Sequence, residues 1–364
     1  MNRPAGPTTL PHSTWHVSAD RIAQSPPEHR GLRRDQVRLL VVEPGAVAHR
    51  HFHHLPQHLR PGDLLVVNSS ATLPAELDGT SPAHGGLVVH VGTSLDDQHS
   101  GPLRRVVELR TAPDAAEPVL DGQQAEEIQV GGGVRFRLVA PYPRPGSSPT
   151  GDGSRLWQAH VLGTDSLEDH LELQGRPISY GYLAERFPLS DYQTIFALHP
   201  GSSEMPSAAR PFTPELVTRL IAGGVGVVPV TLHTGLSSQE AGEPPQAEWF
   251  EVSPATARVV NETRRAGDRV VAVGTTVARA LESAVAADGT VHPRTGWTEL
   301  VITPDRPVRA IDGIITGFHD PEATHLQLIE AVAGAGIMRD AYDAAEAEGY
   351  LWHEFGDSSL LLAR

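Results

Sequence analysis

The chain of 364 residues contains no cysteine, which excludes disulfide bonds, thiolate metal sites and cysteine nucleophiles. No stretch approaches the roughly 18 consecutive apolar residues of a membrane-spanning helix, so no membrane contact is expected. The first residues lack the apolar segment of a secretory signal peptide. Together these absences predict a cytoplasmic protein.

Positive charge is also scarce, because 29 Lys and Arg stand against 44 Asp and Glu and give a formal net charge of −15. An acidic balance does not favour nucleic-acid binding, since phosphates must be met by cations. A local patch would still serve, although a cluster of charges is more often a solvated surface. Six arginines fall in one early stretch: Arg30, Arg33, Arg34, Arg38, Arg50 and Arg60.

The spacing of apolar runs divides the chain into two patterns. Between residues 64 and 161, short β-type runs alternate with turn residues and no convincing helix, which predicts a small antiparallel barrel or sandwich. The run Leu64 to Val67 is assigned to this unit. After about residue 210, strands alternate with helices, which predicts an α/β domain with a largely parallel sheet.

Local signals mark several element boundaries in the α/β part. Thr213 and Ser253, each followed by proline, predict two helix starts, and a further helix is expected from about Thr276 to Ala287. Pro229 lies inside a strand run, which argues against a central position for that strand.

Three predicted strands lead directly into polar residues. The run that ends at Leu232 is followed by His233, the next by Gly274-Thr275-Thr276, and the last by Gly317-Phe318-His319. The carboxyl ends of parallel strands meet at one edge of a sheet, where ligands of open α/β folds bind. The sequence therefore predicts a ligand site at this edge.

The segment Gly274-Thr275-Thr276 has a physical reason to bind a ligand. Glycine lets a ligand approach the backbone, and the start of a helix offers free N–H groups. Glu282, two turns further on, reaches a ribose hydroxyl only if the helix points into the site. The plainer alternatives are that the threonines cap the helix and that Glu282 is solvated.

Several common sites are not indicated. Gly223-Gly224-Val225-Gly226 precedes a strand instead of following one, so it is not a dinucleotide fingerprint, and the sequence has no P-loop and no G-x-S-x-G motif. Alternating histidines at His49, His51 and His53 would share one face of a strand. No nearby carboxylate completes a zinc site, so no metal is predicted.

Many ordered motifs resemble one enzyme family over nearly the whole chain. The chain resembles the S-adenosylmethionine:tRNA ribosyltransferase-isomerases of queuosine biosynthesis. The matching segments include Arg38-Leu39-Leu40-Val41-Val42, Leu59 to Asn68, Asp191-Tyr192-Gln193-Thr194, Val230 to Leu236, Glu248 to Val252, Val273 to Thr276, Arg279 to Ser283 and Ile315 to Thr324.

The resemblance implies a transferase and isomerase reaction in tRNA modification. The family transfers the ribosyl part of S-adenosylmethionine, its co-substrate, to 7-aminomethyl-7-deazaguanine in tRNA, without a metal, and adenine and methionine leave. The resemblance implies an α/β domain, here 1–63 and 162–364, with an inserted β-barrel at 64–161. The implied catalytic residues are His233, His319 and Glu282, and the implied nucleoside-binding residues are Asn68, Tyr192, Gln193, Gly274, Thr275 and Thr276.

The chain also departs from the family pattern. Ser69-Ser70-Ala71 replaces Asp-Thr-Arg, which removes a carboxylate and a guanidinium. Glu204, Arg210 and Pro211 stand for Ala, Leu and His, and Ser237-Ser238-Gln239 replaces Gly-Thr-Phe. These changes and the acidic balance predict weak or no modification of tRNA. Two alternatives stay open: a paralogue that uses S-adenosylmethionine with a small-molecule nucleoside acceptor, and a non-catalytic nucleoside-binding protein.

Overall fold

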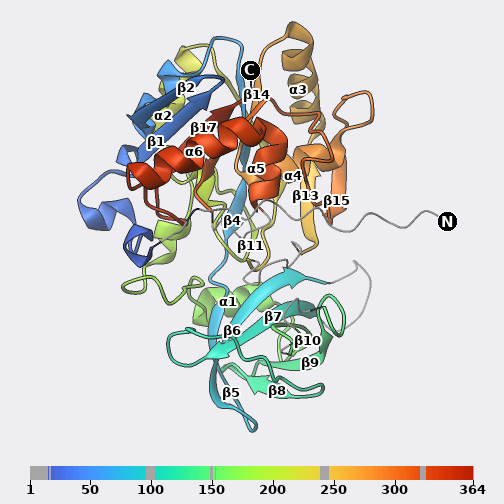
Figure 1. Cartoon of the computed structure of the whole chain (residues 1–364). Coiled ribbons are helices and arrows are strands. Elements are labelled where there is room, and N and C mark those ends of the chain that lie inside the picture. Colours follow the sequence, from blue (N-terminus) through green and yellow to red (C-terminus); the bar gives the residue numbers. More distant parts are fainter. Residues whose placement is uncertain are drawn as a thin grey trace, which may run out of the picture.

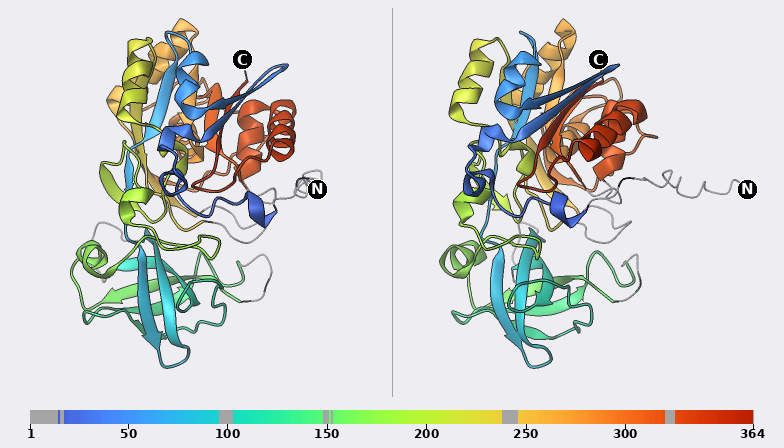
Figure 2. Two further views of the ribbon diagram at one scale, coloured as in Figure 1. Left: turned by 90° about the vertical axis from the view of Figure 1, so that its left-hand side faces the viewer. Right: turned by 60° about the vertical axis from the view of Figure 1, so that its left-hand side comes forward.

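The computed structural model describes residues 15, 18–95, 103–147, 151, 153–237, 246–319 and 325–363. Ser238, Gln239 and residues 320–324 of the segments compared above lie outside the described residues. Two units lie end to end, a large sheet covered by helices and a smaller barrel (Figures 1 and 2). Within the described ranges, no helix is long and apolar enough to cross a membrane.

The larger unit is built on a nine-stranded mixed sheet. In spatial order the strands are β15 (Arg294–Thr298), β13 (Glu248–Val252), β12 (Gly226–Leu232), β3 (Leu64–Asn68), β14 (Val270–Val273), β16 (Gly313–Gly317), β17 (Ser358–Leu362), β1 (Arg38–Glu43) and β2 (Ala46–His51). The four central strands β12, β3, β14 and β16 are parallel to one another, and β17 is parallel to β1. The remaining pairs, β15/β13, β13/β12, β16/β17 and β1/β2, are antiparallel.

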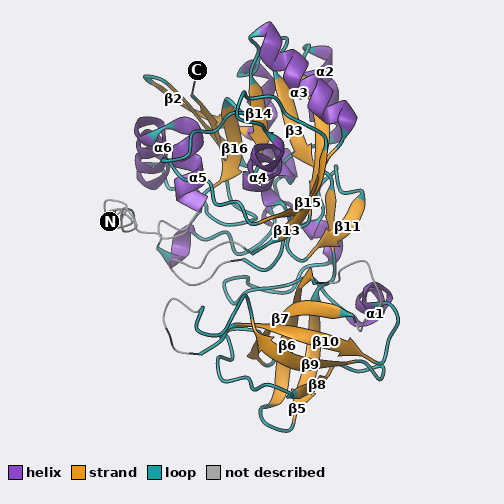
Figure 3. Cartoon of the chain, turned by 90° about the vertical axis from the view of Figure 1, so that its right-hand side faces the viewer, coloured by secondary structure: helices purple, strands orange, loops and turns teal. Residues whose placement is uncertain are grey.

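Helices cover both faces of this sheet, because successive strand residues such as Leu64 and Leu65 point to opposite sides. One core lies under α3 (Pro254–Ala266), α4 (Thr275–Ala284), α5 (His325–Ala333) and α6 (Ala335–Ala347), and the other under α2 (Pro214–Ala222) and the 3-10 helix η4 (Phe52–Gln57) (Figure 3). The two predicted caps are confirmed: Thr213 accepts from Leu216 N–H and Ser253 from Thr256 N–H. Helix α4 ends at Ala284, three residues earlier than expected.

The smaller unit is a closed antiparallel barrel, so the predicted fold class is confirmed. Its strands are, in spatial order, β10 (Leu156–Leu162), β7 (Arg104–Thr111), β6 (Gly85–Ser94), β5 (Glu76–Ser81), β8 (Glu127–Gln129) and β9 (Arg135–Pro141). The assignment of Leu64 to Val67 to the barrel was wrong, because β3 pairs with β12 and β14 in the large sheet. This strand is buried along its whole length, as expected of a central parallel strand.

Short elements connect the two units. Strand β4 (Ser70–Thr72) continues from β3 and pairs with β11 (His199–Ser202), and Figure 1 places this pair between the large sheet and the barrel. Helix α1 (Leu167–Gln174) follows the last barrel strand and is capped by the Ser166 hydroxyl. The chain thus leaves the sheet at the end of β3, which brings the barrel to the carboxyl edge of the parallel strands.

Pro229 lies in a strand that is interior in the sheet order, contrary to the expectation of an edge strand. Strand β13 pairs with β12 only through Thr231 and Leu232, while Pro229 is in register with Val67 of β3 on the other side. The proline therefore occupies the part of β12 that has a single neighbour, where the missing N–H interrupts no ladder toward β13.

Candidate functional site

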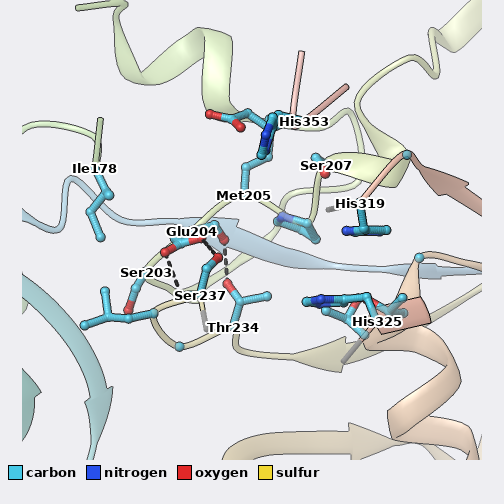
Figure 4. A pocket seen from close by; sticks show the side chains of 18 of the residues that line it. Ile178, Ser203, Glu204, Met205, Ser207, Thr234, Ser237, His319, His325 and His353 are labelled. Carbon is cyan, nitrogen blue, oxygen red and sulfur yellow. Dashed lines mark hydrogen bonds between the residues drawn. The ribbon is translucent and has the colours of Figure 1, made fainter. Parts of the chain in front are cut away.

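A pocket of about 810 Å³ lies where the carboxyl ends of the central parallel strands face the barrel. Residues that follow β12, β14 and β16 line one side, and Arg110, Glu117 and Ile178 line the other. Figure 4 shows the pocket from close by, with His319 and His325 on one side and Glu204 and Ser237 on another. The predicted ligand site at this sheet edge therefore coincides with a real concavity.

The start of helix α4 opens into this pocket. Gly274 is the N-cap residue with a φ of 97°, a conformation that favours glycine, and its N–H donates to Ile315 C=O at 2.8 Å. No side chain caps the helix among the described residues, and Gly274, Thr275 and Thr276 all line the pocket. The free N–H groups and the positive end of the helix dipole are available to an anionic or polar ligand group.

Two carboxylates in the pocket are each held by a tyrosine. Tyr180 O–H donates to Glu204, and Tyr182 O–H donates to Glu354 at 2.6 Å. The two phenol rings stack, with centroids 6.0 Å apart. Burial raises the pKa of both carboxyl groups, and the charge of Glu354 adds to the effect on the pKa of Glu204.

Two half-buried histidines form the opposite part of the pocket. The rings of His319 and His325 stack with centroids 4.5 Å apart, and His319 Nε2 lies 3.0 Å from Thr316 Oγ1. Burial lowers the pKa of His319 well below its ordinary range and that of His325 to about 4. Both rings are therefore neutral at pH 7 and present unprotonated nitrogen.

Five of the nine predicted site residues line the pocket: Tyr192, Gly274, Thr275, Thr276 and His319. The Tyr192 side chain comes from the 3-10 helix η5 (Leu189–Tyr192), is 4% exposed, and its hydroxyl has no hydrogen-bond partner among the described residues. Asn68, Gln193, His233 and Glu282 are not among the lining residues, and each has a different task.

Asn68 and Gln193 bind mainly backbone, although Asn68 Nδ2 also donates to Oγ1 of the pocket-lining Thr276 at 3.4 Å. Asn68 Nδ2 donates to Leu232 C=O at 2.8 Å, and its Oδ1 accepts from the N–H groups of Ser70 and Leu232. Gln193 does the same for Thr72, accepting from its N–H and donating to its C=O. These amides fix the course of the chain between the sheet and the barrel, and their predicted role in nucleoside binding stays a prediction.

His233 lies behind the pocket wall. Its Nδ1 is 2.7 Å from Ser70 Oγ, its ring stacks on Trp249 with centroids 5.1 Å apart, and Gly201 packs so closely that a Cβ there would lie 2.6 Å from the ring. Burial, with a smaller contribution from His199, lowers its pKa to about 4. His233 is thus placed to position Ser70 and the strand end, not to contact a ligand.

Glu282 is buried in α4, about two turns further along the helix than the pocket-lining Thr275. Its Oε1 accepts hydrogen bonds from the N–H groups of Arg309 and Ala310, both at 2.7 Å. Glu282 lies seven residues after Thr275, which is about 10 Å along the helix axis at 1.5 Å per residue. The alternative of a solvated Glu282 is wrong, because the residue is 2% exposed and anchors a loop. Its predicted role toward a ribose stays a prediction.

A family model described as "Queuosine biosynthesis protein" matches residues 11–361. The chain belongs to this family. A protein of Symbiobacterium thermophilum named S-adenosylmethionine:tRNA ribosyltransferase-isomerase is 37% identical over 359 residues, which are 96% of this chain and 98% of that protein. A protein of Rhizorhabdus wittichii with the same name is 38% identical over 93% of this chain and 96% of that protein.

A solved structure shares the fold of this family member. The crystal structure of S-adenosylmethionine tRNA ribosyltransferase from Thermotoga maritima is 25% identical, with a TM-score of 0.51, and the similarity covers 96% of this chain and 99% of that chain. The arrangement of sheet and barrel is therefore common to relatives of low sequence identity.

Several departures from the family pattern are used inside the fold. Ser69 Oγ donates to Val230 C=O at 3.1 Å, and Ser70 Oγ lies 2.6 Å from Ser202 Oγ. The buried Arg210 donates to Asp191 C=O and pairs with Glu28, which ties two loop segments together. Ser69, Ser70 and Ala71 are not among the residues that line the pocket, whereas the next residue, Thr72, is.

The early arginines do not form a free cationic patch. Arg33, Arg34 and Arg38 pair with Asp35, Glu28 and Asp357, and Arg30 donates to Phe355 C=O. Arg50 is exposed on β2, and Arg60 precedes β3, at the edge of the sheet opposite the pocket. The alternating histidines are likewise occupied, with His49, His51 and His53 bonded to Tyr350 O–H, Gln36 C=O and Asp35 C=O.

The residues that sequence reasoning missed are the tyrosine–carboxylate pairs. Tyr180 and Tyr182 flank Gly181 in a segment that forms no helix or strand, and Glu354 comes from the loop between α6 and β17. The spacing of the two tyrosines is the single signal that the sequence offers, and it does not reveal their partners.

Proposed function

We propose that this chain is an S-adenosylmethionine-dependent ribosyltransferase-isomerase that acts on a 7-aminomethyl-7-deazaguanine base in tRNA. The observation that carries the proposal is the pocket at the carboxyl edge of the sheet, which is lined by the start of α4, where no side chain caps the helix. The chain that forms this pocket belongs to the family described above. Relatives that match almost the whole chain are named for this reaction. Such a reaction takes place in the cytoplasm, where tRNA is modified.

The charges of the pocket suit S-adenosylmethionine. The sulfonium and the α-ammonium of this substrate are cationic, and its carboxylate is anionic. Glu204 and Glu354 supply negative charge, while the free N–H groups at Thr275 and Thr276 suit a carboxylate or ribose oxygen. The volume of about 810 Å³ lies in the range of about 300–1,000 Å³ of small-molecule sites, and leaves room for a nucleobase of the acceptor.

The proton transfers would fall to imidazole and carboxyl groups. The bound S-adenosylmethionine supplies the ribosyl group and the two leaving groups, adenine and methionine. The sequence has no lysine and no cysteine, so neither an amine nor a thiol of the chain takes part. His319 and His325 line the pocket and are unprotonated at pH 7, so they are available to accept a proton, and the burial that keeps them neutral also lowers their basicity. We assign the general-base role to His319 and a positioning role to His233.

We propose tRNA as the acceptor in preference to a small-molecule nucleoside. The expectation of weak tRNA modification rested on the changed residues, Ser69-Ser70-Ala71 among them, and on the acidic balance of the chain. Ser69 and Ser70 form hydrogen bonds within the fold, and none of the three residues is among those that line the pocket. Every relative compared here is named for a tRNA substrate, so the small-molecule acceptor has no support from them.

Binding and adenine release test the proposal directly. Calorimetry with the full chain is expected to show S-adenosylmethionine binding at micromolar to millimolar ligand, where a free energy of about −4 kcal/mol already registers. Chromatography is expected to show adenine and methionine when a tRNA with the aminomethyl base is added. Absence of binding at millimolar ligand contradicts the proposed function, and adenine release without tRNA modification supports a small-molecule acceptor.

A further inference from the structure

One wall of the pocket carries a repeated device, a tyrosine that orients a carboxylate. Tyr180 and Tyr182, two residues apart with their rings stacked, donate to Glu204 and Glu354. We call the group formed by Tyr180, Tyr182, Tyr192, Glu204 and Glu354 the tyrosine–glutamate wall, and all five residues line the pocket.

Glu204 is held more firmly than a surface carboxylate. Besides Tyr180, the N–H of Ser237 donates to Glu204 Oε1 at 2.8 Å, and the Ser237 hydroxyl donates to Oε2 (Figure 4). Glu204 and Ser237 are both departures from the family pattern, where alanine and glycine stand. Two changes that are far apart in the sequence therefore meet and fix one carboxylate in the pocket.

In the part of the chain that the structure describes, neither Glu204 nor Glu354 forms an ion pair, whereas the neighbouring Glu248 pairs with Arg279. Arg110 lies over the Tyr180 ring, 5.6 Å from its centroid, but its guanidinium pairs with Glu108. Burial of Glu204 and, to a smaller extent, the negative charge of Glu354 raise the pKa of Glu204. Two carboxylates without a cation would be stabilised by a positively charged ligand group.

A third group in the wall has an unused hydrogen-bonding atom. The Tyr192 side chain is 4% exposed, and its hydroxyl is without a partner among the described residues. Burial, and after it the charge of Glu354, raise the pKa of Tyr192, so the phenol stays protonated beside that carboxylate. A buried hydroxyl without a partner in a pocket wall points to a ligand atom.

We propose that the tyrosine–glutamate wall binds a protonated primary amine of the substrate. This inference rests on the proposed function, in which both substrates carry such a group: the α-ammonium of S-adenosylmethionine and the aminomethyl group of the deazaguanine base. An alkylammonium has three N–H donors, and the wall offers two carboxylates and one phenol oxygen as acceptors. Charge-assisted hydrogen bonds of this kind are the stronger ones, so the wall discriminates between aminated and amine-free ligands.

The test measures that discrimination by calorimetry on the full chain. Four ligands are compared: S-adenosylmethionine, its analogue without the α-amino group, and an anticodon stem-loop that carries either the 7-aminomethyl or the neutral 7-cyano base. Glu204→Gln is expected to lower the affinity for one aminated ligand at least about tenfold, and for its amine-free partner less than about threefold. The ligand pair that loses its discrimination identifies which amine is bound.

Two further variants keep the result interpretable. Tyr180→Phe retains the charge of Glu204 but removes the hydrogen bond that orients its carboxylate. We expect a smaller loss of affinity than in Glu204→Gln, again larger for the aminated ligand than for the amine-free one. This variant replaces Glu204→Gln in the test if Glu204→Gln does not fold. Glu117→Gln removes an exposed carboxylate of the same pocket that no tyrosine holds, and should lower affinity for both members of a pair by one small factor.

The inference would be overturned if Glu204→Gln and Tyr180→Phe lost equal affinity for aminated and amine-free ligands, or if their affinities were unchanged. In that case, binding of S-adenosylmethionine by the wild-type chain would leave the proposed function standing. Failure of the wild-type chain to bind S-adenosylmethionine would contradict the proposed function and, with it, this inference.

Discussion

His233 Nδ1 lies 2.7 Å from Ser70 Oγ, and this contact turns the histidine away from the pocket that His319 lines. The two histidines follow two parallel strands of one sheet, yet only one of them faces the ligand site. Their difference gives a paired test of the catalytic assignment.

His319→Gln is expected to lower kcat by about 100-fold or more, the usual scale for loss of a general base. His233→Gln removes the stacking on Trp249 but leaves the pocket lining intact, and should lower kcat by less than about tenfold. Adenine release under saturating substrates measures both values, and circular dichroism checks that each variant is folded. A larger loss for His233→Gln than for His319→Gln would reverse the assignment.

Thr275→Ala is expected to weaken S-adenosylmethionine binding more than it weakens folding. The N-cap of α4 is Gly274, and no cap hydrogen bond from Thr275 exists to be lost, so the change in unfolding free energy should stay below the about 1 kcal/mol of a true cap. Calorimetry and denaturant unfolding give the two numbers. A sharp fall in stability with unchanged affinity of the folded protein would show that Thr275 supports the helix and not the ligand.

Glu282→Ala is expected to destabilise the fold by about 1–3 kcal/mol, because the backbone N–H groups of Arg309 and of the buried Ala310 lose their acceptor. The folded fraction should retain kcat within a few-fold, since Glu282 is not among the residues that line the pocket. Urea unfolding and adenine release separate the two effects. A stable variant without activity would restore the catalytic role predicted from the sequence.

The barrel contains a buried charge network whose effect on stability depends on pH. Burial alone would raise the pKa of Glu76 and Glu108, but hydrogen bonds and charges of His90 and neighbouring arginines lower both to about 2. Their folded pKa lies below the ordinary value of 4.5, so their contribution is present above about pH 4.5 and is lost as pH falls toward 2.

We therefore expect the melting temperature of the wild-type chain to fall steeply between about pH 4.5 and 2, and that of Glu108→Gln to fall less steeply. If the melting temperatures of the two proteins fell in parallel as the pH was lowered, the network would not control acid stability.

His90 acts in the opposite sense. Its burial would lower its pKa, but Glu108 and Glu76 raise it, so its contribution to stability is lost as pH rises through the pKa of the folded state.

The sequence predicted features that depend on neighbours along the chain. Thr213 and Ser253 mark helix starts through their own side chains, and strand ends at Gly274 and His319 lie at one sheet edge because parallel strands share direction. The approach failed where the side-chain direction depends on packing, as for Asn68, which ends β3 and turns its amide toward the backbone of β12.

The tyrosine–glutamate wall was beyond sequence reasoning for a different reason. Glu204 and Glu354 are carried by loops, and the segment with Tyr180 reaches them only because the chain leaves β3 toward the barrel and returns past the pocket. Such contacts depend on how two units dock, and no local period records them. The same holds for Arg210, which reads as a lost apolar residue but joins Glu28 and Asp191.

The most direct test of the account is mass spectrometry of a tRNA that carries 7-aminomethyl-7-deazaguanine, after incubation with the full chain and S-adenosylmethionine. The account predicts that the base gains the rearranged ribosyl group, with adenine and methionine released in equal amounts, and that His319→Gln slows this gain by about 100-fold or more. A tRNA base of unchanged mass after incubation with wild-type chain that binds S-adenosylmethionine would contradict it.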